Sequence, residues 1–493
     1  MHSAEEVWNL LLEISRMPWG PARSAQAATA VMWADALEGE SELQIDAYLE
    51  LALSYQEGSE EWKALAPLAV LSQKLKKNPS LFSAENIEKT ARMYRDGVVS
   101  AARNPAISLE QIDELLDSLA QFICDQGFSM HSFHGARYTI AMNEGRLEEA
   151  SSALATWRAT PRDAMTCCAS CDAIKQITEA SVRKDWDRAV ATAMPLFDEE
   201  GFCGAQPYGI RAYAMIPLLM SGRPETAWEA HVRSYPHHRG VAVTIQILGL
   251  HMEFLVRSGR WQRALEILRE SIALTSQAAN ASVLMDYLQG AALTAREASK
   301  RGPEKEPFNA LCTGQSQWYP GPRLEADTPL ADVADALSRW ALDVASVFDA
   351  RNGNDYCTRS VQEVLDASTV DDEAEKRATD TWNFDVVRER ESMPEPISTL
   401  EGETAPPLRE ARSSNNHNPT IDESDPYPPV CYELPAAPQS LQEAFDRYLA
   451  RKCAIGFDLE GSLLVDWALC CKEDLSSVTY DATDHETLLV FVM

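Results

Sequence analysis

The sequence repeats one short pattern four times: GRLEEA (145–150), KDWDRA (184–189), GRPETA (222–227) and GRWQRA (259–264). The starts of the four copies lie 39, 38 and 37 residues apart. A period in this range is typical of stacked helix pairs, in which each pair buries its apolar face against its neighbours. The pattern therefore predicts an all-α fold, an α-solenoid of helix pairs over residues 131–300.

Each copy of the pattern lies between two segments with the apolar spacing of a helix. Gly145, Gly222 and Gly259 open three of the copies, and glycine adopts the left-handed conformation that ends many helices at little cost. Every copy ends in alanine, which is small enough for two antiparallel helices to approach closely. We therefore expect a helix, a left-handed turn and a second helix in each unit.

The spacing of the glycine, of a large residue two positions later and of the alanine resembles the middle of the tetratricopeptide repeat. The units are longer than that family's usual length of about 34 residues, so we describe them as tetratricopeptide-like. CGAQP (203–207) and FDARNGND (348–355) resemble stretches of uncharacterised actinobacterial repeat proteins. These resemblances imply a repeat architecture that binds partners, and they imply no activity.

Composition divides the rest of the chain into further regions. The first region, residues 1–130, has helical patterns without the turn motif, which indicates either degenerate repeats or a capping bundle. The closing region contains an amphipathic helix predicted over residues 329–350. The last region is either a small separate domain or a further helix pair. In order, the regions are residues 1–130 (N-terminal helices), 131–300 (repeats), 301–390 (closing helices), 391–429 (acidic disordered linker) and 430–493 (small C-terminal module).

The chain is strongly acidic, with 44 basic and 75 acidic residues and a net charge of −31. Residues 371–493 hold 26 acidic and 10 basic side chains, so this stretch carries −16 of the total. Such a field repels phosphate backbones and anionic lipids. We therefore expect a protein or peptide partner of basic character, and neither nucleic acid nor a membrane. The sequence does not indicate an oligomeric state.

The sequence also predicts where the protein resides. The N-terminus lacks a basic region and an apolar run of export length, and no later segment reaches the length of a membrane-spanning helix. Eleven cysteines, an odd number, do not suggest a secreted disulfide framework. We therefore predict a cytoplasmic protein with reduced thiols.

One group of cysteines has the spacing of a metal site. Cys168 and Cys171 have the two-residue gap that lets two thiolates reach one zinc ion, and Cys203 and His231 follow 32 and 28 residues later. The repeat places the cysteines at the same end of neighbouring helix pairs, so these four residues are a candidate structural zinc site. The alternatives are a redox dithiol and ordinary buried cysteines.

Two pairs of histidines are weaker candidates for a metal or anion site. His237 and His238 follow Tyr235-Pro236 in a predicted loop, where exposed loop histidines are the simpler interpretation. His131 and His134 lie three residues apart on a predicted helix, but no carboxylate near them in the sequence completes a metalloprotease-like set.

The first helices of a tetratricopeptide-like array line the concave groove in which partners bind. Arg137, Lys175, Tyr208 and Arg211 lie on or beside these predicted helices, either as groove residues or as outward-facing surface residues. We expect no enzyme, because the common catalytic motifs are absent from the sequence. The leading hypothesis is an interaction scaffold. The alternatives are a metal- or ligand-responsive sensor that uses the cysteines, and an enzyme of unknown class whose residues converge only in three dimensions.

Overall fold

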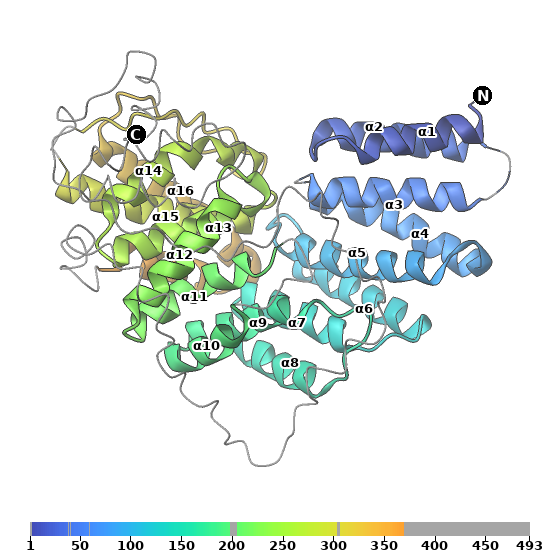
Figure 1. The fold of residues 1–493 in the computed structure, drawn as a ribbon, viewed down its shortest axis with the longest axis horizontal. Coiled ribbons are helices and arrows are strands. Elements are labelled where there is room, and N and C mark those ends of the chain that lie inside the picture. Colours follow the sequence, from blue (N-terminus) through green and yellow to red (C-terminus); the bar gives the residue numbers. More distant parts are fainter. Residues whose placement is uncertain are drawn as a thin grey trace, which may run out of the picture. The chain divides into compact units, whose positions relative to one another are not determined.

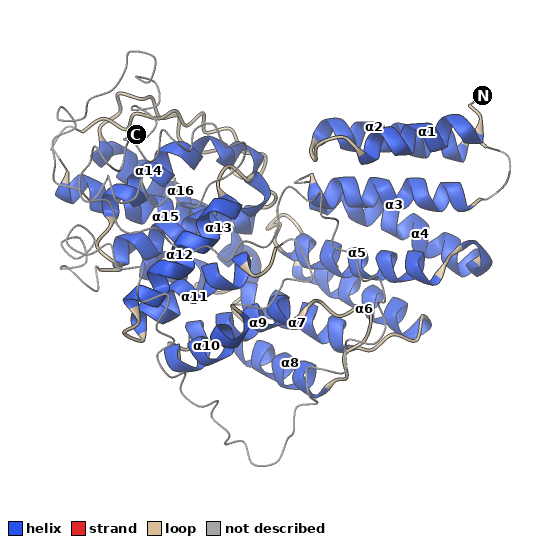
Figure 2. Ribbon diagram, in the orientation of Figure 1, coloured by secondary structure: helices blue, strands red, loops and turns tan. Residues whose placement is uncertain are grey.

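The computed structural model describes residues 2–368, apart from residues 38, 40, 59, 198–204 and 303–305. Within these residues the regular elements are seventeen α-helices and five short 3-10 helices, with no strand among them (Figure 2). The all-α prediction is therefore confirmed for this part of the chain. None of these helices is long and apolar enough to cross a membrane. The predicted linker (391–429), the predicted C-terminal module (430–493) and Cys203 lie outside the described residues.

Residues 2–125 contain six α-helices: α1 (Ala4–Ser15), α2 (Pro21–Asp35), α3 (Glu42–Glu57), α4 (Leu65–Lys77), α5 (Ala84–Ala102) and α6 (Leu109–Asp125) (Figure 1). Serine side chains begin three of them, because Ser3, Ser83 and Ser108 each accept a hydrogen bond from a backbone N–H in the first turn. These bonds satisfy donors that the start of a helix leaves without an intrahelical partner.

Eight further helices form the four predicted pairs: α7 (His131–Asn143) with α8 (Leu147–Ala159), α9 (Ala169–Val182) with α10 (Trp186–Ala193), α11 (Tyr208–Met220) with α12 (Pro224–His238), and α13 (Ile245–Arg257) with α14 (Trp261–Ser271). The two helices of each pair pack against each other. The alanine that ends each copy of the sequence pattern is buried, as expected for a residue between close helices.

The turn inside each pair has the predicted left-handed conformation. The backbone angle φ is +74° at Gly145, +79° at Gly222 and +82° at Gly259. In the second pair Lys184 takes the same position with φ of +58°. This conformation costs a residue other than glycine roughly 1–2 kcal/mol. The packing of the two helices therefore contributes more free energy than the left-handed lysine costs.

Helix α12 is longer than the sequence indicates, and this corrects one prediction. The segment around His237 and His238 is predicted as a loop, but the helix continues through Pro236 to His238. A proline inside a helix removes one backbone hydrogen bond. Tyr235 and His238 are both buried in the last turn, and this burial outweighs the loss. His238 is therefore an interior residue, not an exposed loop histidine.

From the second pair onwards, the first helices pack against one another in chain order. Helix α9 contacts α11, α11 contacts α13, and α13 contacts α15 (Ala281–Arg301). The backbones of α13 and α15 approach so closely that a Cβ atom on Gly290 would lie 2.1 Å from the carbonyl oxygen of Gly249. One hydrophobic core extends through these helices from Ala173 to Leu365.

A second hydrophobic core joins the N-terminal helices to the first repeat pair. It begins at Ile45 in α3 and includes Ala136 and Ile140 of α7 and Met165 in the segment after α8. Helix α7 also packs against α5 and α6. The predicted regions 1–130 and 131–300 therefore share buried side chains.

Two helices close the described part of the chain. The predicted amphipathic helix is confirmed as α16 (Leu330–Asn352), and a second helix, α17 (Tyr356–Leu365), follows it. Both pack against α15. The carboxylate of Asp349 fixes the bend between them, because it accepts a hydrogen bond from the backbone N–H of Cys357 at 2.8 Å.

Residues at the bend between α16 and α17 also form hydrogen bonds to the ends of distant helices. Arg351 Nη1 donates to the carbonyl oxygens of Ala102 and Asn104 at 2.8 and 3.2 Å, at the end of α5. Asn354 Nδ2 donates to the carbonyl oxygen of Glu144 at 2.8 Å, at the end of α7. The FDARNGND stretch therefore connects the closing helices to the first half of the chain.

Candidate functional site

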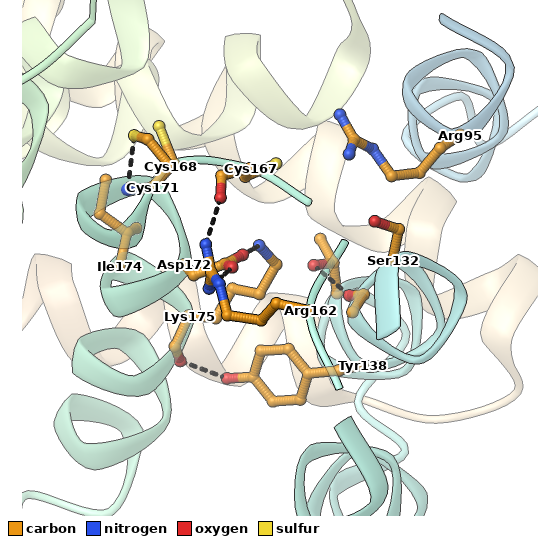
Figure 3. A network of polar contacts seen from close by, with 12 residues as sticks. Arg95, Ser132, Tyr138, Arg162, Cys167, Cys168, Cys171, Asp172, Ile174 and Lys175 are labelled. Atoms are coloured by element: carbon orange, nitrogen blue, oxygen red, sulfur yellow. Dashed lines mark hydrogen bonds and ion pairs between the residues drawn. The ribbon is translucent and has the colours of Figure 1, made fainter. Parts of the chain in front are cut away.

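Two cysteines occupy the first turn of α9, as the sequence indicates. Cys168 is the residue immediately before the helix, and its extended backbone (φ −61°, ψ 160°) turns the side chain back over the first turn. Its Sγ atom accepts a hydrogen bond from the backbone N–H of Cys171 at 3.4 Å (Figure 3). Both cysteine residues are partly accessible to solvent. The sequence pattern Cys-x-x-Cys thus becomes a compact arrangement at a helix start.

A buried carboxylate lies in the same turn. Only 5% of the Asp172 side chain is exposed, and it forms ion pairs with Arg162 Nη1 at 2.5 Å and Lys175 Nζ at 2.9 Å. Arg162 Nη2 also donates to the carbonyl oxygen of Cys167 at 2.6 Å, so it connects the carboxylate to the cysteine segment (Figure 3). Lys175, a predicted groove residue, is therefore half-buried and paired with a carboxylate.

The segment that leads to the cysteines is anchored on two other helices. Arg95 Nη1 in α5 and the Ser132 hydroxyl in α7 both donate to the carbonyl oxygen of Met165, at 2.9 and 3.0 Å. The Met165 side chain is fully buried. Because the backbone is fixed three residues before Cys168, the thiols have a defined position relative to α5 and α7.

Burial changes the acidity of two groups beside this segment. It raises the pKa of the Cys167 thiol, although the nearby Arg95 and Lys175 act in the opposite direction. It also lowers the pKa of His131 to about 4, and that imidazole lies against the Trp157 ring with a centroid distance of 4.9 Å. His131 is thus a neutral side chain of the protein interior. The sequence offers His131 as a metal ligand only through its spacing from His134.

A buried amide connects the cysteines to the next repeat pair. Gln206, which is 5% exposed, donates from Nε2 to the Sγ atom of Cys171 at 3.4 Å. Its Oε1 atom accepts a hydrogen bond from the backbone N–H of Ile210 at 3.0 Å, in the first turn of α11. Gln206 belongs to the stretch CGAQP and was not predicted as a site residue.

His231 occupies a different environment from the cysteines. It is 1% exposed in α12, and its Nδ1 atom shares a hydrogen bond of 3.0 Å with Nδ1 of His251 in α13. Within the described residues, no three or more histidine, cysteine or acidic side chains are arranged to hold a metal ion. Cys168, Cys171 and His231 therefore form no such group among themselves, and Cys203 lies outside the described residues.

The other predicted groove residues have three different environments. Arg137 is exposed and forms an ion pair with Glu149, with an Nε–Oε1 distance of 3.1 Å. Tyr208 is 37% exposed and its ring stacks on His237 at 4.2 Å between centroids. Arg211 is 4% exposed, and its Nη2 atom donates to the carbonyl oxygen of Phe197 at 2.6 Å. Arg211 thus stabilises the fold between α10 and α11.

A cluster of buried histidines was not predicted. His231, His238 and His251 are each almost fully buried, and the rings of His238 and His251 are 6.5 Å apart. Burial lowers the pKa of His238 to about 4 and that of the other two well below the ordinary value. The sequence gives a signal only for His251, which occurs in the apolar segment IQILGLHMEFLV (245–256), whereas the segment around His231 and His238 is mixed in polarity.

Asp286 on α15 combines solvent exposure with a perturbed acidity. Its side chain is exposed, yet burial raises its pKa to about 6, and the Arg103 guanidinium at the end of α5 opposes this rise. Burial, with a further contribution from the charge of Asp286, raises the pKa of Tyr213 on α11 and of Tyr356 on α17. We call Asp286, Arg103, Tyr213 and Tyr356 the Asp286 group.

No family model matches the chain, and no curated protein matches its sequence.

Proposed function

We propose that this chain is an α-solenoid of tetratricopeptide-like helix pairs that binds a protein or peptide partner along its first helices. The observation that carries this proposal is the series of contacts between α9, α11, α13 and α15. In a repeat array, first helices that pack in chain order form one continuous layer, and such layers present an extended binding surface. This architecture supports a scaffold or adaptor role.

The proposed partner is basic. The net charge of −31 attracts cationic chains over a distance of several ångströms and raises their association rate. The Asp286 group supplies a carboxylate whose charge acts on two tyrosines, side chains that frequently contribute to protein interfaces. Among the predicted groove residues, Tyr208 is available for contact on the same helix as Tyr213, and Arg137 is exposed beside its partner Glu149.

Site-specific photocrosslinking tests the location of the partner. A photoreactive phenylalanine analogue replaces the half-buried Tyr213 on first helix α11 or, as the control, the exposed Asp187 on second helix α10. We expect a protein adduct from position 213 and none from position 187. Equal adducts from both positions, or none from position 213, would contradict binding along the first helices.

The charge of the partner is tested with synthetic peptides of equal length, one rich in lysine and one rich in glutamate. We expect the lysine peptide to bind more tightly, and its affinity to fall as salt rises. We expect Asp286→Asn to weaken the affinity for the lysine peptide several-fold, and Asp187→Asn to leave that affinity within twofold of the wild type. The same affinity for both peptides would exclude the proposed electrostatic preference.

A regulatory sensor is a second candidate function, favoured by one specific observation. Cys168 and Cys171 share the first turn of α9, and a buried amide donates to the sulfur of Cys171. A change of chemical state at this pair would alter a contact between neighbouring repeat pairs.

A further inference from the structure

The thiols of Cys168 and Cys171 share the first turn of α9. Side chains three residues apart on a helix have Cβ atoms about 5–6 Å apart, whereas a disulfide needs about 3.5–4.5 Å. Cys168 precedes the regular helix, and its extended backbone places its Sγ atom 3.4 Å from the backbone nitrogen of Cys171. The Cys168 sulfur therefore lies over the same turn that carries the second thiol.

Both sulfur atoms accept hydrogen bonds that stabilise a thiolate. The backbone N–H of Cys171 donates to Cys168, and the Gln206 amide donates to Cys171. The amide is buried, so water competes little for this donor. The start of α9 adds the favourable end of a helix dipole, which stabilises negative charge within the first turn.

Other described cysteines lack this combination. Cys312 and Cys357 are buried, and burial raises the pKa of each thiol. Cys124 is exposed, and its sulfur lies 3.7 Å from the sulfur of Met130. Cys167 lies next to the pair, but burial raises its pKa as well. Accessibility, a nearby second thiol and donors to both sulfurs therefore coincide at Cys168 and Cys171.

We propose that Cys168 and Cys171 form a reversible dithiol–disulfide site that reacts with small-molecule disulfides. The Cys168 thiolate attacks one sulfur of the small disulfide, a mixed disulfide forms, and one thiolate leaves. The Cys171 thiol then gives its proton to solvent and attacks the Cys168 sulfur, and the second thiolate leaves. Two electrons pass from the cysteine pair to the small disulfide, which becomes two thiols.

The reaction would change the contact between two repeat pairs. Cys171 accepts the hydrogen bond from Gln206, and Gln206 also binds the backbone at the start of α11. In the disulfide the Cys171 sulfur carries no negative charge and has turned towards Cys168, so this donor bond weakens. Oxidation therefore acts on the junction between α9 and α11. The proposal does not depend on partner binding.

The test uses the full chain equilibrated with mixtures of reduced and oxidised glutathione. Samples are quenched with acid, alkylated under denaturing conditions and digested for mass spectrometry. We expect Cys168 and Cys171 to lose alkylation together, with one midpoint and a linked peptide that is two hydrogens lighter. In Cys171→Ser, oxidised glutathione leaves an adduct on Cys168. The control Cys124→Ser keeps the wild-type midpoint.

The wild-type measurement decides the question even where a variant does not fold. Full alkylation of both thiols in the most oxidising mixture would overturn the proposal. A disulfide from either thiol to Cys167 or Cys203 would also overturn it. Protein purified without chelator is analysed for metal as well. One zinc ion per chain that blocks the exchange would assign the cysteines to metal binding instead.

Discussion

At the scale of single residues, the buried histidines make the stability of the fold depend on pH. Burial holds the pKa of His238 at about 4 in the folded protein, and His231 and His251 are also held well below their ordinary value. In the unfolded chain a histidine binds a proton as the pH falls through about 6.5. The unfolded state therefore gains protons first, and the free energy of unfolding decreases from about pH 6.5 towards pH 4.

His238→Gln removes one of these groups and keeps a hydrogen-bonding partner for Thr244. Between pH 7 and pH 5, a histidine with these two pKa values costs the wild type about 2 kcal/mol of unfolding free energy. We therefore expect the variant to lose about that much less than the wild type over this range. Urea unfolding followed by circular dichroism at several pH values measures the difference.

The control for this prediction is His2→Gln, which changes an exposed histidine whose ring stacks on Trp33. Its unfolding free energy should follow the wild-type dependence on pH. A difference in unfolding free energy between wild type and His238→Gln that is the same at every pH indicates only altered packing. If the unfolding free energies of His238→Gln and of the wild type change equally between pH 7 and pH 5, burial does not lower the pKa of the His238 imidazole, and the prediction is wrong.

At the scale of elements, the turn inside each helix pair combines a local requirement with a contact elsewhere. Gly145 and Gly222 have nearly the same φ, +74° and +79°. A Cβ atom on Gly222 would meet nothing within 4 Å, but one on Gly145 would lie 2.4 Å from Cβ of Tyr356 in α17. In the third pair, glycine at this position serves only the turn. In the first pair, it also allows helix α17 to approach the turn closely.

This contrast predicts unequal costs for two matched substitutions. Gly222→Ala adds only the strain of a left-handed alanine, roughly 1–2 kcal/mol. Gly145→Ala adds the same strain and an overpacked contact with α17, for which about 1–3 kcal/mol more is typical. Chemical unfolding of the two variants measures the difference. Equal destabilisation would mean that α17 moves away from the turn without cost.

The sequence predicts the elements whose signals are local. The four pairs follow from GRLEEA and its copies because the turn, the cap and the buried alanine occur within six residues. The cysteine pair is equally local, since both thiols belong to one turn. Helix α17 was not predicted separately, because it is only ten residues long and its apolar face is recognisable only against α15 and α16. The contact between His231 and His251 depends on how α12 packs on α13, and no short pattern encodes that packing.

At the scale of the whole molecule, Arg351 connects segments that are far apart in the chain. It donates to the carbonyl oxygen of Ala102 across 249 residues of sequence and to that of Asn104. These two carbonyls flank Arg103, whose guanidinium acts on the Asp286 carboxyl. The bend between α16 and α17 thus fixes the end of α5 that contributes to the Asp286 group. Stability and the proposed binding surface depend on the same contact.

Arg351→Ala removes this connection and leaves two carbonyl groups without their donor. Loss of a partner at buried polar groups costs about 1–3 kcal/mol, so the unfolding free energy should fall by that amount. Hydrogen exchange should quicken together at the end of α5 and in α16 and α17, because each depends on the other.

Arg359→Ala is the matched control: it is an exposed arginine paired with Asp355 on the surface, and such pairs contribute about 0–1 kcal/mol. If only α17 loses protection in Arg351→Ala, the end of α5 is held by its own packing. The Asp286 group would then keep its affinity for the lysine peptide, whereas a loosened α5 would lower that affinity along with the stability.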